Sequence, residues 1–274
     1  MKTIAALLLG LWLAPSQATA PQAAPQLSRI AVVGASVSAG FGIGPSPVGG
    51  AVKLADIIGL SIASEHETPR NLATTLAYLN FPGYADRTLA ELAKDPPSAL
   101  IAIDYLFWSV HGTRSEADEV MQLEKALSGL ASLSCPILLG DIPDVTSATV
   151  GPSPMITSAM MPSPAARDAA NARIRAWAAN RANVTMVPLA DLIKKVNDGA
   201  EVQIRGNVWK AGDAGQRLIQ GDHLHATLEG LAAIWIAAAD SWLRADAKLP
   251  ASALELRPAT LVEAATQSLN KRTR

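Results

Sequence analysis

Residues 29–44, which read RIAVVGASVSAGFGIG, constrain the fold more than any other part of the chain. The short apolar run at 30–33 ends at Gly34, and small residues with three more glycines follow it. An apolar run of this length that stops at glycine is typical of a buried strand ending in a tight turn. Open α/β sheets bind ligands at the carboxyl ends of their strands, so Ser36 is a candidate nucleophile; the alternative is that it caps a following helix.

Three common glycine-rich loops do not fit this stretch. A phosphate-binding loop needs Lys and then Ser or Thr after its last glycine, whereas Gly40 is followed by Phe and Gly. A dinucleotide-binding loop needs a second glycine two positions after Gly34, where Ser36 stands. The nucleophile elbow of the α/β-hydrolases needs glycine two positions after the nucleophile, where Ser38 stands.

The amino terminus predicts export. Residues 1–20 read MKTIAALLLGLWLAPSQATA, with a positive Lys2, an apolar core at 4–13 and the small residues of a cleavage site at 18–20. A core of this length is too short to span a bilayer, so the segment is predicted to be a secretory signal peptide. After a linker at 21–28, the mature protein is expected to be secreted or periplasmic, with no transmembrane segment once the leader is removed.

Composition narrows the classes of partner. A chain of 274 residues with 49% hydrophobic and 17% charged residues can bury one substantial core, which predicts one domain at 29–246 and a solvated tail at 247–274. The net charge of −1 gives no basic surface for nucleic acid or anionic lipid. The single cysteine, Cys135, lies in an apolar run and is expected to be a buried thiol. Four scattered histidines lack metal-ligand spacing, so we expect no metal and no cofactor.

Strand-like and helix-like segments alternate along the chain. Four apolar runs predict strands at 30–33, 99–103, 135–139 and 184–188. Helices are predicted at 51–58, 88–94, 115–133, 165–180 and 228–243, with a further helix in the ambiguous stretch 61–80, where Leu72, Leu76 and Leu79 have helical spacing. This alternation predicts parallel βαβ units, a sheet covered on both faces and an α/β fold. The loop at 145–164 is long enough to border a substrate site or to be a mobile surface excursion.

A second block of chemistry, QGDHLHAT at 220–227, precedes the last predicted helix. Asp222 and His225 are three positions apart, so on a helical turn their side chains lie about 5–6 Å apart on one face. A carboxylate there can hold one imidazole nitrogen and leave the other to accept a proton from a serine, which is too weakly acidic to attack a carbonyl unaided. His223 is a possible rival base.

Together these blocks carry a family resemblance. The residues GAS at 34–36, with D-x-x-H at 222–225 ahead of TLEG at 227–230, resemble the SGNH or GDSL family of esterases and lipases over residues 29–243. The resemblance implies a flavodoxin-like three-layer α/β/α sandwich with a mostly parallel sheet of about five strands. It also implies that Ser36 attacks an ester while His225, rather than His223, is the base, because the family places its histidine three after the aspartate.

The chain departs from the family at two points. The family has Asp between the glycine and the serine of its first block, where this chain has Ala35. The family also builds an oxyanion hole from the serine amide, a glycine and an asparagine, whose positions here predict Ser36, Gly83 and Asp104. An ionised carboxylate would oppose a developing oxyanion. Asp104 is therefore expected to be protonated or bonded elsewhere, leaving backbone amides as donors, or to be a structural carboxylate that binds amides in a turn.

The predicted function is that of an exported serine esterase. It would hydrolyse a carboxylic ester of a lipid, a small molecule or an O-acetylated glycan through an acyl-enzyme on Ser36, with Asp222 orienting His225. One alternative is a catalytically impaired module of the same fold that binds glycan or lipid. The other is an acyltransferase that uses the same triad with an alcohol acceptor.

Overall fold

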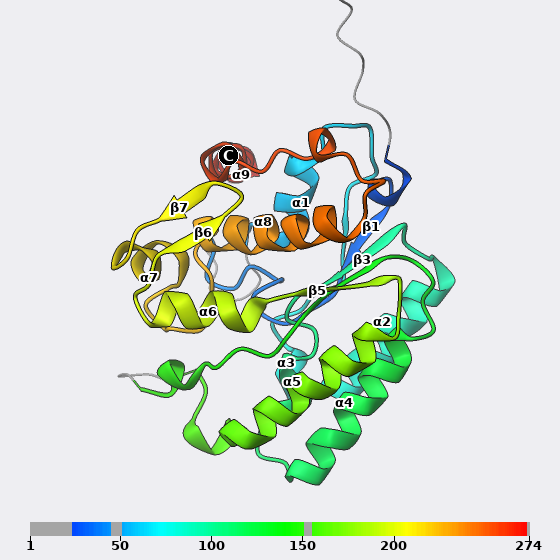
Figure 1. Ribbon diagram of the computed structural model, residues 1–274, viewed down its shortest axis with the longest axis vertical. Coiled ribbons are helices and arrows are strands. Elements are labelled where there is room, and N and C mark those ends of the chain that lie inside the picture. Colours follow the sequence, from blue (N-terminus) through cyan, green and yellow to red (C-terminus); the bar gives the residue numbers. More distant parts are fainter. Residues whose placement is uncertain (1–23, 45–50, 151–154, 273–274) are drawn as a thin grey trace, which may run out of the picture.

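The structure is a computed structural model that describes residues 24–44, 51–150 and 155–272. The predicted signal peptide at 1–20 and the first part of the linker lie outside these residues. At the centre is a five-stranded parallel sheet of order β2-β1-β3-β4-β5 (Figure 1). The strands are β1 (Ile30–Val32), β2 (Arg70–Asn71), β3 (Ala99–Ala102), β4 (Ile137–Gly140) and β5 (Val184–Val187).

Helices cover both faces of the sheet, which explains why β1, β3 and β4 are apolar and buried along their whole length. One layer contains α1 (Leu54–Ser61), α6 (Leu189–Asn197), α7 (Asp213–Leu218), α8 (Leu228–Ala245) and α9 (Pro258–Arg272). The other contains α2 (Phe81–Lys94), α3 (Phe107–Val110), α4 (Glu116–Leu130) and α5 (Pro164–Ala179). Figure 1 shows the two layers on either side of the strands, so the predicted three-layer α/β/α fold is confirmed. A hairpin of β6 (Val202–Ile204) and β7 (Asn207–Trp209) lies beside α6 and α8.

The four predicted strands are present, but the stretch 61–80 was predicted wrongly as helical. It holds the short strand β2 and a single 3-10 turn, Ala77–Leu79. The helix predicted at 88–94 is the later part of α2, which begins at Phe81. Asn80 caps this helix by accepting a hydrogen bond from the Gly83 amide, and proline is favoured in a first turn because its missing N–H has no partner there.

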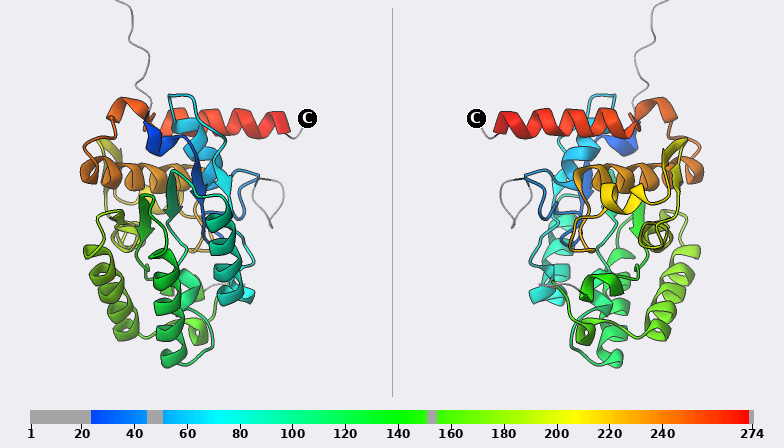
Figure 2. Two further views of the ribbon diagram at one scale, coloured as in Figure 1. Left: turned by 90° about the vertical axis from the view of Figure 1, so that its right-hand side faces the viewer. Right: turned by 90° about the vertical axis from the view of Figure 1, so that its left-hand side faces the viewer.

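The carboxyl-terminal segment is not the solvated tail that the sequence suggested. Residues 258–272 form α9, in which Leu261 and Ala265 are fully buried against α1 and α8. The apolar residues of α9 recur at helical spacing, so they form one stripe that packs against the body of the protein. Figure 2 shows the far end of α9 extending beyond the body of the molecule.

Candidate functional site

The turn after β1 positions Ser36. Pairing with β3 continues through Val33, whose amide donates to the Ile101 carbonyl at 2.9 Å, and the chain then turns at Gly34. Gly34 has φ of +158°, and a Cβ there would lie 2.1 Å from the nearer carboxylate oxygen of Asp104, so no other residue fits. The Tyr84 hydroxyl on α2 accepts from the Gly34 amide at 2.8 Å and donates to its carbonyl at 2.9 Å. Burial raises the pKa of Tyr84, so the phenol keeps the proton that it donates.

Asp104, at the end of β3, holds the same turn from the other side. One carboxylate oxygen accepts from the amides of Val37 at 2.9 Å and Ser38 at 3.1 Å, and the other accepts from the Ser38 hydroxyl at 2.5 Å. Burial raises the pKa of this carboxyl group more than the hydrogen bonds from Ser38 and the neighbouring amides lower it. Asp104 is thus a structural carboxylate that accepts hydrogen bonds, not the oxyanion-hole donor that its position in the sequence suggested.

Substitutions at Asp104 test this structural role. We expect Asp104→Ala to lower the free energy of unfolding by about 2–4 kcal/mol, because two amides and a hydroxyl lose their acceptor. Asp104→Asn keeps an acceptor oxygen and carries no charge to desolvate, so its stability should stay within about 1 kcal/mol of the wild type. Urea denaturation of the three proteins measures the difference. Equal losses in both variants would show that the negative charge, rather than the acceptor, holds the turn.

The D-x-x-H block forms a compact turn between α7 and α8. One oxygen of Asp222 accepts from the amides of Leu224 and His225, each at 3.0 Å, and the other accepts from His225 Nδ1 at 2.6 Å. Partial burial raises the pKa of Asp222, but the bonds from the imidazole and the two amides outweigh it and hold the pKa at about 2. The hydrogen bond assigns the proton to Nδ1 and leaves Nε2 as the basic nitrogen.

His225, not His223, is the histidine that Asp222 holds. His225 is 2% exposed, and its ring stacks on that of Phe41 with the centroids 4.2 Å apart. His223 is exposed, has a left-handed φ of +56° and has no hydrogen bond to Asp222. The turn therefore presents a single oriented imidazole.

Gln220 joins the two blocks of chemistry, and the sequence analysis did not single it out. Its side-chain amide donates to the Phe41 carbonyl at 2.7 Å and to the Ala226 carbonyl at 2.7 Å. The Phe41 amide in turn donates to the Ser36 carbonyl at 2.9 Å. This chain of hydrogen bonds ties the loop of the candidate nucleophile to the loop of the candidate base across most of the length of the polypeptide.

Ser36 and His225 line one cavity of about 410 Å³, which we call the outer cavity and which Thr75 and Trp108 also line. Within the described residues no hydrogen bond joins the Ser36 hydroxyl to the imidazole. Such bonds are often loose in ligand-free enzymes and tighten when substrate binds. The structure thus brings the predicted serine and histidine to one space, with Asp222 behind the histidine.

Gly83, the glycine expected in the oxyanion hole, does not line the cavity that Ser36 and His225 share, whereas Thr75 does. The Gly83 amide donates to the side chain of Asn80, which caps α2. Gly83 lines neither this cavity nor a second one that Ser36 also borders. Parallel pairing of β1 with β2 continues past the strands through a bond from the Thr74 amide to the Gly34 carbonyl at 3.1 Å, which places Thr75 beside Ser36. In the part of the chain that the structure describes, neither the Thr75 amide nor the Ser36 amide donates to another residue.

Over residues 24–44, 51–150 and 155–272, no group of three His, Cys, Asp or Glu residues is placed to hold a metal ion. Among the same residues, no helix combines the length and the apolar character needed to cross a bilayer.

The solved structures that are similar to this chain include the following two. One is TesA, 17% identical with a TM-score of 0.47, over 81% of this chain and 100% of that one. The other is assigned as a GDSL-like lipase from Parabacteroides merdae, 14% identical with a TM-score of 0.44, over 81% of this chain and 97% of that one. No family model and no curated protein sequence matches the chain.

Proposed function

We propose that this protein is a serine hydrolase of the SGNH or GDSL type that cleaves carboxylic esters through an acyl-enzyme on Ser36. The observation that carries the proposal is the shared outer cavity: Ser36 and His225 both border it, and Asp222 fixes the imidazole with its proton on Nδ1. This is the arrangement that a weakly acidic hydroxyl needs in order to act as a nucleophile.

The chemistry follows from these positions. His225 Nε2 accepts the Ser36 hydroxyl proton as Oγ bonds to the ester carbonyl carbon, and the ionised Asp222 stabilises the resulting imidazolium. The carbonyl oxygen becomes an oxyanion, for which the amides of Ser36 and Thr75 are the available donors. The bond to the alcohol oxygen then breaks, the imidazolium returns its proton to that oxygen, and the acyl group stays on Ser36. Water activated by His225 hydrolyses the acyl-enzyme in the reverse sense.

The proposal extends to where the protein works. Residues 1–20 have the charge, core length and cleavage residues of a signal peptide, so we place the enzyme in the periplasm or outside the cell. Its substrates there would be esters of small molecules, lipids or O-acetylated glycans.

A fluorophosphonate probe tests the nucleophile directly. The purified protein should be labelled once per chain, because the probe phosphonylates only a serine whose proton a nearby base accepts. Fragment mass spectrometry should place the adduct on Ser36 and not on Ser38, whose hydroxyl is buried and donates to Asp104.

A folded protein that takes no label would count against the proposal and in favour of a binding module without turnover. A labelled protein that releases acyl groups to added sugars faster than to water would be an acyltransferase.

A further inference from the structure

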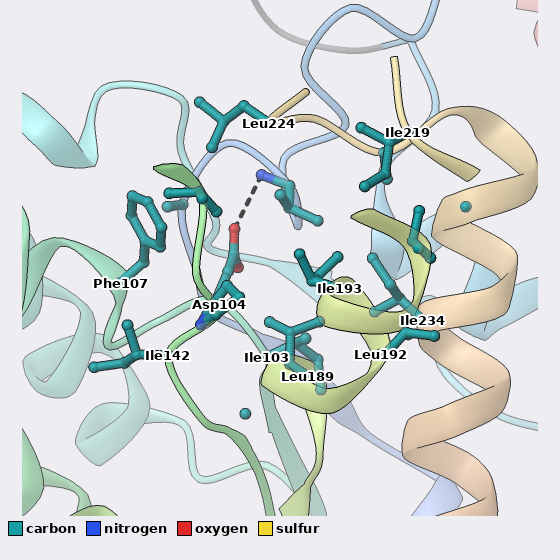
Figure 3. A pocket seen from close by; sticks show the side chains of 18 of the residues that line it. Ile103, Asp104, Phe107, Ile142, Leu189, Leu192, Ile193, Ile219, Leu224 and Ile234 are labelled. Atoms are coloured by element: carbon teal, nitrogen blue, oxygen red, sulfur yellow. Dashed lines mark hydrogen bonds between the residues drawn. The ribbon is translucent and has the colours of Figure 1, made fainter. Parts of the chain in front are cut away.

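A second cavity also meets Ser36, and His225 is not among the residues that line it. This inner cavity of about 50 Å³ lies between the ends of β3 and β4 and the helices α6 and α8. Figure 3 shows its aliphatic lining, which includes Ile103, Ile142, Leu192, Ile193 and Ile234. Ser36 and Leu224 line both cavities, so the candidate nucleophile stands where they meet.

The position of the imidazole distinguishes the two cavities chemically. His225 lines the outer cavity and not the inner one. The alcohol leaving an ester takes its proton from His225, so its oxygen must lie on the imidazole side of Ser36. The acyl group, which stays bonded to Ser36 Oγ, then has the inner cavity open to it.

We propose, resting on the esterase function above, that the inner cavity is the acyl site and the outer cavity the alcohol site. Its size limits the acyl group. The inner cavity has about 50 Å³ of space against about 410 Å³ for the outer cavity, so it suits the smaller part of the ester. We therefore assign it short acyl groups, of about two to four carbons.

The lining also selects against charge. The carboxylates that border the inner cavity are committed to protein donors: Asp104 accepts from Val37 and Ser38, and Asp141 accepts from the Ala190 amide at 2.7 Å. Among the described residues no Lys or Arg lines this cavity, and His223 is its one basic side chain. A charged acyl group among the aliphatic side chains would lose its water, so the substrate is an ester of a short, uncharged carboxylic acid.

The outer cavity is larger and more exposed. Tyr78 and Leu76 on its rim are about half exposed, at 49% and 52%, and Trp108 and Met155 contribute further apolar surface. A bulky apolar or partly apolar alcohol fits this space. Selectivity is therefore narrow for the acid and broad for the alcohol.

Kinetics with p-nitrophenyl esters of acetate, butyrate, hexanoate and octanoate test the assignment, because only the acyl group changes. The wild type should show its highest kcat/KM with acetate or butyrate and fall at least about 10-fold by octanoate, since one methylene too many in an apolar pocket changes kcat/KM by about 10–200-fold. Leu192→Ala, which enlarges the inner cavity, should move the optimum to hexanoate or longer.

Two control variants separate the cavities. Leu127→Ala truncates an equally apolar side chain on α4, away from both cavities, and should leave the order of the four esters unchanged. Tyr78→Ala on the rim of the outer cavity should change the ratio of rates for naphthyl and ethyl acetate but not the order of the acyl series. An acyl preference that changes in Tyr78→Ala but not in Leu192→Ala would reverse the assignment of the two cavities. A wild-type preference for octanoate would overturn the proposal. Absence of hydrolysis with every ester, together with absence of fluorophosphonate labelling, would instead defeat the proposed function.

Discussion

Ester hydrolysis by the Ser36→Ala variant is expected to be at least about 10⁴-fold slower than by the wild type, with the fold intact. The loss follows because Ser36 is the hydroxyl proposed to give its proton to His225, while the remaining donors stabilise only a direct attack by water. Ser36 makes no side-chain hydrogen bond within the described residues, so removal of its hydroxyl should change the free energy of unfolding by less than about 0.5 kcal/mol. Initial rates with p-nitrophenyl acetate and urea denaturation give the two quantities.

Ser38→Ala is the matched control, since it removes a hydroxyl two positions away. The Ser38 hydroxyl donates to Asp104 and is fully buried, so this variant should lose stability by about 1 kcal/mol or more and keep a nucleophile. The expected pattern is thus an inactive stable protein and a less stable active one. An active Ser36→Ala variant beside an inactive Ser38→Ala variant would move the nucleophile to Ser38.

The features that the sequence predicted well are local. The strands were found because β1, β3 and β4 lie between two helical layers and are apolar along their whole length. The pairing of Asp222 with His225 is also local, because it closes one turn of the chain and needs only the three-residue spacing.

The features that it missed depend on neighbours far away in the sequence. The pairing of β1 with β2 places Thr75 near Ser36. Strand β2 is only two residues long and has no apolar pattern by which the sequence could predict it. Gln220 matters because of its bond to Phe41, 179 positions away. Position alone suggested Gly83, whose amide is instead used to begin a helix. Contacts of this kind are set by tertiary packing and leave no signal in a short window of sequence.

Asp104 shows a further limit. The strand predicted at 99–103 placed Asp104 correctly at the sheet edge, and the charge of Asp104 argued against an oxyanion role. Whether Asp104 is a structural carboxylate depends on whether backbone amides surround it. The tight turn of residues 36–38 supplies those amides. A carboxylate can stand close to a developing oxyanion when its own lone pairs are occupied by donors that also shape the nucleophile turn.

Asp222→Asn should lower kcat/KM by about 10³–10⁴-fold while leaving the imidazole in place. In the wild type the carboxylate accepts from His225 Nδ1 at 2.6 Å, which leaves Nε2 free to accept the serine proton. An asparagine that turns its NH₂ group toward the ring makes Nδ1 the acceptor, so the proton moves to Nε2 and the base faces Ser36 with no lone pair. Nuclear magnetic resonance of the imidazole nitrogens would report the tautomer alongside the rate.

The pH dependence separates orientation from charge. The pKa of Asp222, about 2, lies below that of an unfolded aspartate, so the charged form is favoured by folding. Its stabilising contribution is complete above about pH 4 and is lost as the pH falls toward 2, whereas Asp222→Asn should show no loss from this group in that window. Above pH 4 the wild-type carboxylate stays ionised, so the rate deficit of the variant should persist at every pH where the wild type is active. A deficit of less than about 10-fold with the Nδ1 tautomer retained would show that backbone contacts orient His225 and that Asp222 acts only through stability.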